Sequence, residues 1–170
     1  EVIASLDIPF IDMTPYSLGE KESKTLEAIE KKEPLIYRGR ISADDLLGEP
    51  DLLRLGEDGY VAGDIKSGAG EEGDADDPRP KKHYAVQLAL YTDILERKGL
   101  SSKREPFVWD IHGEEVTYEL DELTGKRNPT TLWNIYRDTL DEARRNISNP
   151  ENSSPAYSSI CKLCRWGTEC

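Results

Sequence analysis

Apolar residues recur along the chain with two spacings, one typical of helices and one typical of strands. The helical spacing predicts helices at residues 23–33, 83–98 and 130–147. Alternating or short continuous apolar runs predict strands at residues 35–41, 51–55, 60–66, 106–111 and 116–120. The strands at 51–55 and 60–66 flank Gly56-Glu57-Asp58-Gly59, which has the composition of a hairpin turn. The order of these elements predicts a mixed α/β fold.

Two stretches depart from simple amphipathic patterning. The predicted helix at 83–98 is apolar nearly all round, so we expect it to be buried against a sheet on more than one side, with Gly99 as its C-terminal stop. Residues 67–82 instead hold Gly, Asp, Glu and Pro with almost no apolar side chain. This composition predicts a mobile surface loop.

The length of the chain, 170 residues, suits one domain with a substantial core, so residues 1–170 are predicted to form a single domain. No run approaches the roughly 18 apolar residues of a membrane span, and no segment resembles a signal peptide. We therefore expect a soluble, cytoplasmic protein with no membrane partner. The chain starts at Glu1 without an initiator Met and ends on Cys170, so it is expected to be a fragment.

The chain carries 22 Lys and Arg against 34 Asp and Glu, a formal net charge of −12. Spread evenly, this charge would argue against a nucleic-acid partner, because phosphate binding needs Lys and Arg. The charge is uneven, however, with acidic segments at residues 71–77 and 110–122. Basic residues gather around the first predicted strand and before the 83–98 helix: Arg38, Arg40, Arg79, Lys81 and Lys82. They either face phosphates or form a solvated face.

Three residues with the chemistry of a metal site fall at the ends of the predicted hairpin strands. Asp51 opens the first strand, and Asp64 and Lys66 end the second. A hairpin folds back on itself, so the two Asp residues can lie together although 13 positions separate them. Two carboxylates and a backbone carbonyl suit Mg²⁺, and Lys66 shares a face with Asp64, where it can orient or help deprotonate an attacking water. The alternative is a pair of surface carboxylates with a salt bridge.

The ordered segments Gly48-Glu49-Pro50-Asp51, Asp64-Ile65-Lys66 and Gln87-Leu88-Ala89-Leu90-Tyr91 resemble the RecB-like branch of the PD-(D/E)XK nuclease superfamily. The resemblance covers roughly residues 26–170. It implies a restriction-endonuclease-like core, in which a mixed central sheet is flanked by helices. It also implies metal-dependent hydrolysis of DNA, acting on single strands or DNA ends in repair, recombination or defence.

The resemblance assigns a role to each residue of these motifs. Asp51, Asp64 and the Ile65 carbonyl would hold Mg²⁺ or Mn²⁺, and Lys66 would position the attacking water. Gln87 and Tyr91 are four positions apart and share one helical face, from which they would support the site and the DNA strand.

The three cysteines of the chain, Cys161, Cys164 and Cys170, have the spacing C-x2-C-x5-C. Thiolates this close together suit zinc or an iron–sulfur cluster better than disulfides. The spacing resembles the C-terminal triplet of RecB-like nucleases that carry a [4Fe–4S] cluster, including the CRISPR-associated exonucleases. In those proteins the fourth Cys lies far upstream, and this chain has no upstream Cys. Either the fourth ligand was lost with a missing N-terminal part, or the cluster does not assemble in this fragment. The chain is thus expected to be a fragment that lacks that cysteine and an N-terminal helix. Zinc, with His83 or His112 as fourth ligand, is the competing interpretation.

Members of the family usually carry a further Glu or His on an N-terminal helix. Glu27 and Glu30 are the candidates here, although both could simply be solvated. In such proteins the nuclease-like domain often precedes a helicase, so DNA and a helicase domain or subunit are the expected partners. Two alternatives remain: a non-catalytic, metal-free domain that holds DNA or docks onto a helicase, and a zinc-stabilised interaction domain.

Overall fold

A computed structural model describes residues 8–74, 76, 78–101, 103–125, 128–152, 161–162 and 164–165. The chain divides into two compact units, residues 1–136 and 137–170. The first unit contains the sheets and two helices, and a third helix runs from the first unit into the second. Whether residues 1–170 act as the predicted single domain stays a prediction. In the part of the chain that is described, no helix combines the length and the apolar character needed to cross a membrane.

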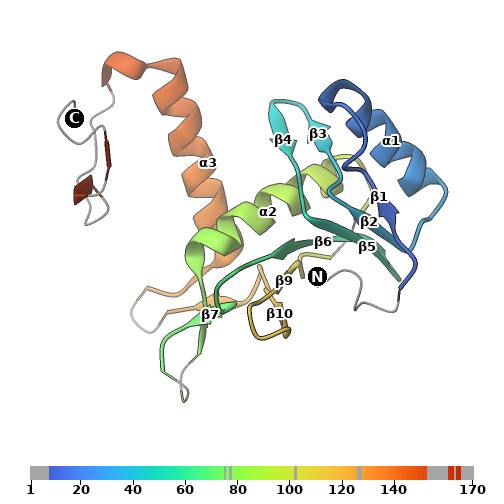
Figure 1. The fold of residues 1–170 in the computed structure, drawn as a ribbon. Helices are drawn as coiled ribbons and strands as arrows, with labels where there is room; N and C mark the ends of the chain where they lie inside the picture. The colour runs from blue at the N-terminus through green and yellow to red at the C-terminus, as the bar shows by residue number, and fades with distance from the viewer. Residues whose placement is uncertain are drawn as a thin grey trace. The chain divides into compact units, whose positions relative to one another are not determined.

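A six-stranded sheet forms the centre of the first unit (Figure 1). Its spatial order is β1 (Ile11–Asp12), β2 (Leu35–Tyr37), β5 (Leu52–Gly56), β6 (Gly59–Ile65), β9 (Phe107–Trp109) and β10 (Glu115–Thr117). β1 runs parallel to β2 and β6 runs parallel to β9, while the other neighbours are antiparallel. The sheet is therefore mixed, and the predicted α/β class is confirmed.

Helices α1 (Leu18–Glu30) and α2 (Lys82–Arg97) lie on the same side of this sheet (Figure 1). Helix α1 begins five residues before the predicted start, because Ser17 caps it and donates a 2.6 Å hydrogen bond to the Glu20 carboxylate. Helix α2 is buried along much of its length, as its apolar pattern predicts. It ends at the predicted stop, where Gly99 takes φ +67°.

The predicted strand at 35–41 is interrupted, and this corrects the sequence pattern. Arg38 takes φ +54°, a conformation that ends β2 at Tyr37. The chain then forms an unpredicted hairpin from β3 (Ile41–Ala43) and β4 (Leu46–Gly48). Ile41 and Leu46 are buried in this hairpin, which contacts α2.

The predicted surface loop at 67–82 is also more ordered than its composition suggests. Its ends form a short ladder between β7 (Glu71–Glu72) and β8 (Arg79–Pro80). Gly70 is fixed before this ladder, because its N–H donates to the buried Asp110 carboxylate at 3.2 Å and its carbonyl accepts a hydrogen bond from Tyr118. The loop is therefore anchored to the sheet just after Lys66.

Further elements follow β10 along the chain. A two-stranded ribbon, β11 (Leu123–Thr124) with β12 (Thr130–Thr131), precedes α3 (Leu132–Ser148), and a single 3-10 turn, η2 (Pro150–Asn152), follows α3. Leu132, Trp133 and Tyr136, in the first turns of α3, are buried.

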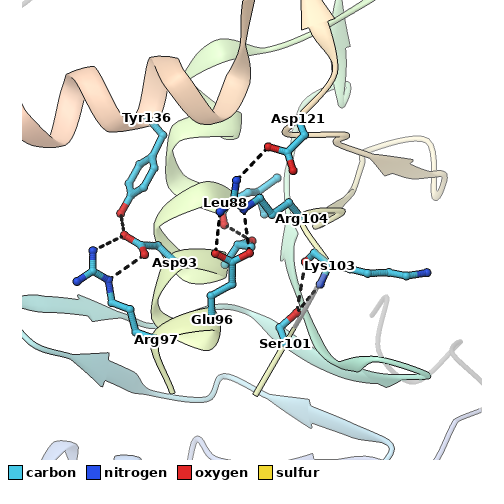
Figure 2. A network of polar contacts seen from close by, with 10 residues as sticks. Leu88, Asp93, Glu96, Arg97, Ser101, Lys103, Arg104, Asp121 and Tyr136 are labelled. Atoms are coloured by element: carbon cyan, nitrogen blue, oxygen red, sulfur yellow. Dashed lines mark hydrogen bonds and ion pairs between the residues drawn. The ribbon is translucent and has the colours of Figure 1, made fainter. Parts of the chain in front are cut away.

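Ionic contacts fix the far end of α2 (Figure 2). The buried Asp93 accepts hydrogen bonds from the Tyr136 hydroxyl at 2.7 Å and from Arg97 Nε at 2.8 Å. Arg104 pairs with Glu96 at 2.8 Å, and its guanidinium lies 3.7 Å from the centre of the Trp133 ring. These contacts join the C-terminal half of α2 to Arg104 and to the first turns of α3.

Candidate active site

The residues of the predicted site gather at one end of the central sheet. The register sets Leu52 of β5 opposite both Tyr37 of β2 and Gly63 of β6. The residues just beyond these three positions therefore lie at the same end of the sheet: Arg38, Asp51 and Asp64. The hairpin thus brings the two predicted carboxylates together.

Asp51 lies at the open end of the β5–β6 hairpin, opposite the turn. Its Oδ2 accepts a 3.0 Å hydrogen bond from the backbone N–H of Ile65. Its Oδ1 lies 3.5 Å from Arg38 Nε, and its backbone carbonyl accepts a 2.8 Å hydrogen bond from the N–H of Arg38. The side chain of Asp51 remains 21% exposed, so the carboxylate is positioned by the backbone yet open to solvent.

Asp64 is the most buried charged group of the site, at 3% exposure. Its Oδ2 contacts the Lys66 ammonium as an ion pair, but no described residue gives this oxygen a hydrogen bond of regular geometry. Burial raises the pKa of Asp64 from 3.8 to about 6, Lys66 opposes this rise, and the neighbouring Asp51 adds to it. The buried carboxylate therefore has an oxygen for which the protein supplies no complete set of partners.

Lys66 is linked to helix α2 through a chain of hydrogen bonds. Its Nζ donates to Gln87 Oε1 at 2.8 Å, and Gln87 Nε2 donates to the Tyr91 hydroxyl at 2.8 Å. Burial raises the pKa of Tyr91 to about 12, so its hydroxyl stays protonated near neutral pH. The helical spacing of Gln87 and Tyr91 thus places both on the face that meets Lys66.

Two residues around this chain of hydrogen bonds were not singled out by the sequence. The Tyr84 ring lies 5.0 Å from Lys66 Nζ, a cation–π contact that its position three residues before Gln87 on the same helical face could have suggested. A Cβ added to Gly48 would lie 2.6 Å from Tyr91 Cδ1. The first position of the Gly-Glu-Pro-Asp motif is therefore a glycine because the Tyr91 ring packs against its backbone.

The donor set fits a divalent cation of the Mg²⁺ type. Among the residues that the structure describes, no group of three or more His, Cys, Asp or Glu side chains could hold a metal. Asp51 and Asp64 supply two carboxylates, one with an unsatisfied buried oxygen. The Ile65 N–H points to Asp51, and because the N–H and C=O of one strand residue point the same way, its carbonyl faces that side too. Two carboxylates and one carbonyl, completed by water, are ligands that Mg²⁺ accepts.

The other predicted ligands lie outside this cluster. Glu27 is half-exposed on α1 and pairs with Lys24 at 2.8 Å and Lys31 at 2.9 Å, which lowers its pKa to about 2. Glu30 is exposed on the same helix. His83 is exposed and meets the Tyr84 ring edge to face, with ring centres 4.4 Å apart, and His112 is exposed in the turn before β10.

The cysteine cluster is described only in part. The N–H of Cys164 donates a 3.2 Å hydrogen bond to the Cys161 carbonyl. Cys170, the third predicted ligand, lies outside the described residues. Whether the three thiols share a metal or a cluster therefore stays a prediction.

Residues 13–170 match the PD-(D/E)XK nuclease superfamily. The chain belongs to this superfamily. Pro50-Asp51 and Asp64-Ile65-Lys66 are the segments that carry its naming motif here, and they are the segments that the hairpin brings to one end of the sheet. Membership in the PD-(D/E)XK nuclease superfamily indicates hydrolysis of phosphodiester bonds. None of the curated proteins matches the chain.

Proposed function

We propose that the protein hydrolyses phosphodiester bonds of DNA, on single strands or at DNA ends, with the help of Mg²⁺ or Mn²⁺. The observation that carries the proposal is the meeting of Asp51, Asp64 and Lys66 at one end of the sheet in a member of a nuclease superfamily. Asp51, Asp64 and the Ile65 carbonyl would hold the cation. A cation bound there would stabilise negative charge on the phosphate and lower the pKa of water.

The protein groups around the cation have separate tasks. Lys66 positions the attacking water and offsets the charge that develops on the phosphate. Gln87 fixes the ammonium of Lys66 through a 2.8 Å hydrogen bond. The Tyr91 hydroxyl accepts a hydrogen bond from the amide nitrogen of Gln87, and this orients the amide oxygen toward Lys66. The deeper of the two carboxylates, Asp64, must lose its proton before it can bind a cation.

Cleavage of an end-labelled single-stranded DNA by the full chain in Mn²⁺ tests this proposal. Asp64→Ala and Lys66→Ala remove a metal ligand and the catalytic ammonium. Lys103→Ala is the matched control, because Lys103 is a half-exposed lysine whose ion-pair partner, Asp58, lies in the turn between β5 and β6. Cleavage should occur with the wild type and the control and be lost in the other two variants. Equal activity in all four proteins would exclude the catalytic assignment.

Titration of Mn²⁺ by calorimetry separates the nuclease from a metal-free domain that only holds DNA or docks onto a helicase. The proposed site should bind Mn²⁺ in the wild type and lose that binding in Asp64→Ala. A wild type that takes up no Mn²⁺ at this site would instead support the non-catalytic alternative.

We further propose that the protein belongs to the RecB-like branch and carries a [4Fe–4S] cluster on Cys161, Cys164, Cys170 and a fourth cysteine of a longer chain, with a helicase domain or subunit as partner. The link from Gln87 and Tyr91 to Lys66 supports the branch assignment. An anaerobic preparation that includes the fourth cysteine should absorb near 400 nm. A colourless, zinc-containing preparation would favour zinc as the bound metal.

A further inference from the structure

Arg38 forms an ion pair with the open carboxylate of the site, Asp51. Its Nε lies 3.5 Å from Asp51 Oδ1, while 56% of its side chain remains exposed. Arg40 and Lys81, two other basic residues near the site, are engaged elsewhere: Arg40 pairs with Glu49, and Lys81 Nζ donates to the Ala69 carbonyl at 2.8 Å. The Arg38 guanidinium also hydrogen bonds with the Tyr37 side chain, and its exposure leaves the rest of the fork accessible to an anion beside Asp51.

The backbone of Arg38 is held in a conformation that arginine rarely adopts. Its φ is +54°, and its N–H donates a 2.8 Å hydrogen bond to the Asp51 carbonyl. A non-glycine residue in this region costs of order 1 kcal/mol or more, and such strain is found where function requires it. Glycine would adopt the same backbone without that cost, so Arg38→Gly removes the side chain without adding backbone strain.

Two aromatic rings lie in succession beside Arg38. The Arg38 guanidinium lies 5.7 Å from the centre of the Tyr37 ring. The Phe10 ring meets Tyr37 edge to face, with centres 6.4 Å apart, and Phe10 is 40% exposed. A guanidinium followed by an exposed aromatic ring offers a phosphate contact and then a stacking surface, the pairing that single-stranded nucleic acids use.

We propose that Arg38, Tyr37 and Phe10 form a subsite that binds one nucleotide of single-stranded DNA next to the phosphate at the Asp51–Asp64 site. The Arg38 guanidinium binds the phosphate of that nucleotide, and its base stacks on the exposed Phe10 ring, while Tyr37 holds the two side chains together. A paired base stays inside its duplex, so this subsite favours single-stranded over double-stranded substrate. The inference rests on the proposed function, because that function makes the neighbouring Asp51–Asp64 site the place where the phosphate is cleaved.

Binding in EDTA at low salt tests the subsite without cleavage. The probes are a fluorescent thymidine oligomer and an abasic oligomer of the same length. The variants of the full chain are Arg38→Gly, which suits the observed φ, Arg38→Lys, which keeps the charge, Phe10→Ala, and the distant control Lys103→Ala. Thermal melting confirms that each variant is folded.

Each variant should change binding in its own way. Arg38→Gly weakens binding of both oligomers about tenfold or more and reduces the slope of log affinity against log salt by about 0.7. Arg38→Lys recovers the slope but not the full affinity, because the planar fork is lost. Phe10→Ala weakens binding of the thymidine oligomer about fivefold or more and leaves the abasic oligomer unaffected. Lys103→Ala behaves like the wild type.

The proposal is overturned if Arg38→Gly binds both oligomers as Lys103→Ala does, if Phe10→Ala affects both oligomers equally, or if the wild type binds neither oligomer. Cleavage in Mn²⁺ is measured in parallel. A wild type that shows the binding pattern but cleaves nothing contradicts the proposed function and supports the subsite. A wild type that cleaves while Arg38→Gly matches the control contradicts the subsite alone.

Discussion

The buried carboxylate of Asp64 destabilises the metal-free protein, but it suits the binding of a cation. Its carboxylate is almost fully buried next to a second carboxylate, and one of its oxygens lacks a regular hydrogen bond from the described residues. A buried charge without a complete set of partners destabilises the fold. A divalent cation between Asp51 and Asp64 would remove both the repulsion and the unsatisfied oxygen, which is why the residue is better explained by binding than by stability.

Replacement of this carboxyl should therefore stabilise the metal-free protein in a pH-dependent way. The folded pKa of Asp64, about 6, lies above its ordinary value of 3.8, so the folded state holds the proton more tightly. The stability that this proton contributes is complete below pH 4 and is lost as the pH rises through 6. An asparagine at position 64 cannot ionise. The free energy of unfolding of Asp64→Asn, relative to that of the wild type, should therefore rise by about 1–3 kcal/mol from pH 4 to pH 8. Urea unfolding in EDTA at both pH values measures this difference between variant and wild type. A difference that is the same at pH 4 and pH 8 would contradict a raised pKa of Asp64 in the folded state.

Helix α2 contacts the candidate site through its middle turns and other elements through its last turns. Toward the site, the Tyr91 ring packs on the backbone of Gly48 and Gln87 reaches Lys66. At the other end, Asp93 and Glu96 bind groups from neighbouring elements (Figure 2). Lys66, the lysine that we propose to be catalytic, is thus held by Gln87 of α2 as well as by its own backbone hydrogen bond to Trp109.

Gly48→Ala should disturb the site without altering any proposed ligand. The new Cβ would lie 2.6 Å from Tyr91 Cδ1, so the ring must move and its hydrogen bond with Gln87 is weakened. We expect a loss of about 1–3 kcal/mol in stability and a cleavage rate lowered about tenfold or more, with Mn²⁺ affinity unchanged. Gly19→Ala is the matched control, because nothing lies within 4 Å of its new Cβ. If both variants cleave at the wild-type rate, the packing of Tyr91 does not position Lys66.

Tyr136→Phe should affect stability but not chemistry. It removes the 2.7 Å hydrogen bond to the buried Asp93 carboxylate, while Arg97 keeps its own contact with Asp93. A hydrogen bond to a charged group contributes about 1.5–3 kcal/mol, so the free energy of unfolding should fall by that amount. Tyr16→Phe, at a 37% exposed tyrosine, serves as control in urea unfolding. A Tyr136→Phe protein as stable as this control would show that the contact contributes nothing.

At the scale of the whole molecule, the sequence predicts those parts of the site that depend on local periodicity. The meeting of Asp51 and Asp64 follows from a hairpin, and the shared face of Gln87 and Tyr91 follows from helical spacing. The β3–β4 hairpin was missed because its strands have three residues each and because the φ of Arg38 leaves no trace in the alternation of apolar residues.

Long-range contacts explain the remaining difference between pattern and structure. The segment after Lys66 has the composition of a free loop, yet Asp110 and Tyr118 anchor it at Gly70 from more than 35 positions away. No local pattern encodes such pairing. The net charge of −12 is equally uninformative by itself, because the placement of Arg38 and Lys66 beside the carboxylates decides where a phosphate could bind.

The central claim, that Lys66 performs chemistry beside a metal held by Asp51 and Asp64, is tested most directly by the single-turnover cleavage rate of Lys66→Ala at saturating Mn²⁺ and pH 8. We expect this variant to bind Mn²⁺ as the wild type does but to cleave single-stranded DNA at least about a hundredfold more slowly. An unchanged single-turnover rate with Mn²⁺ bound would contradict it.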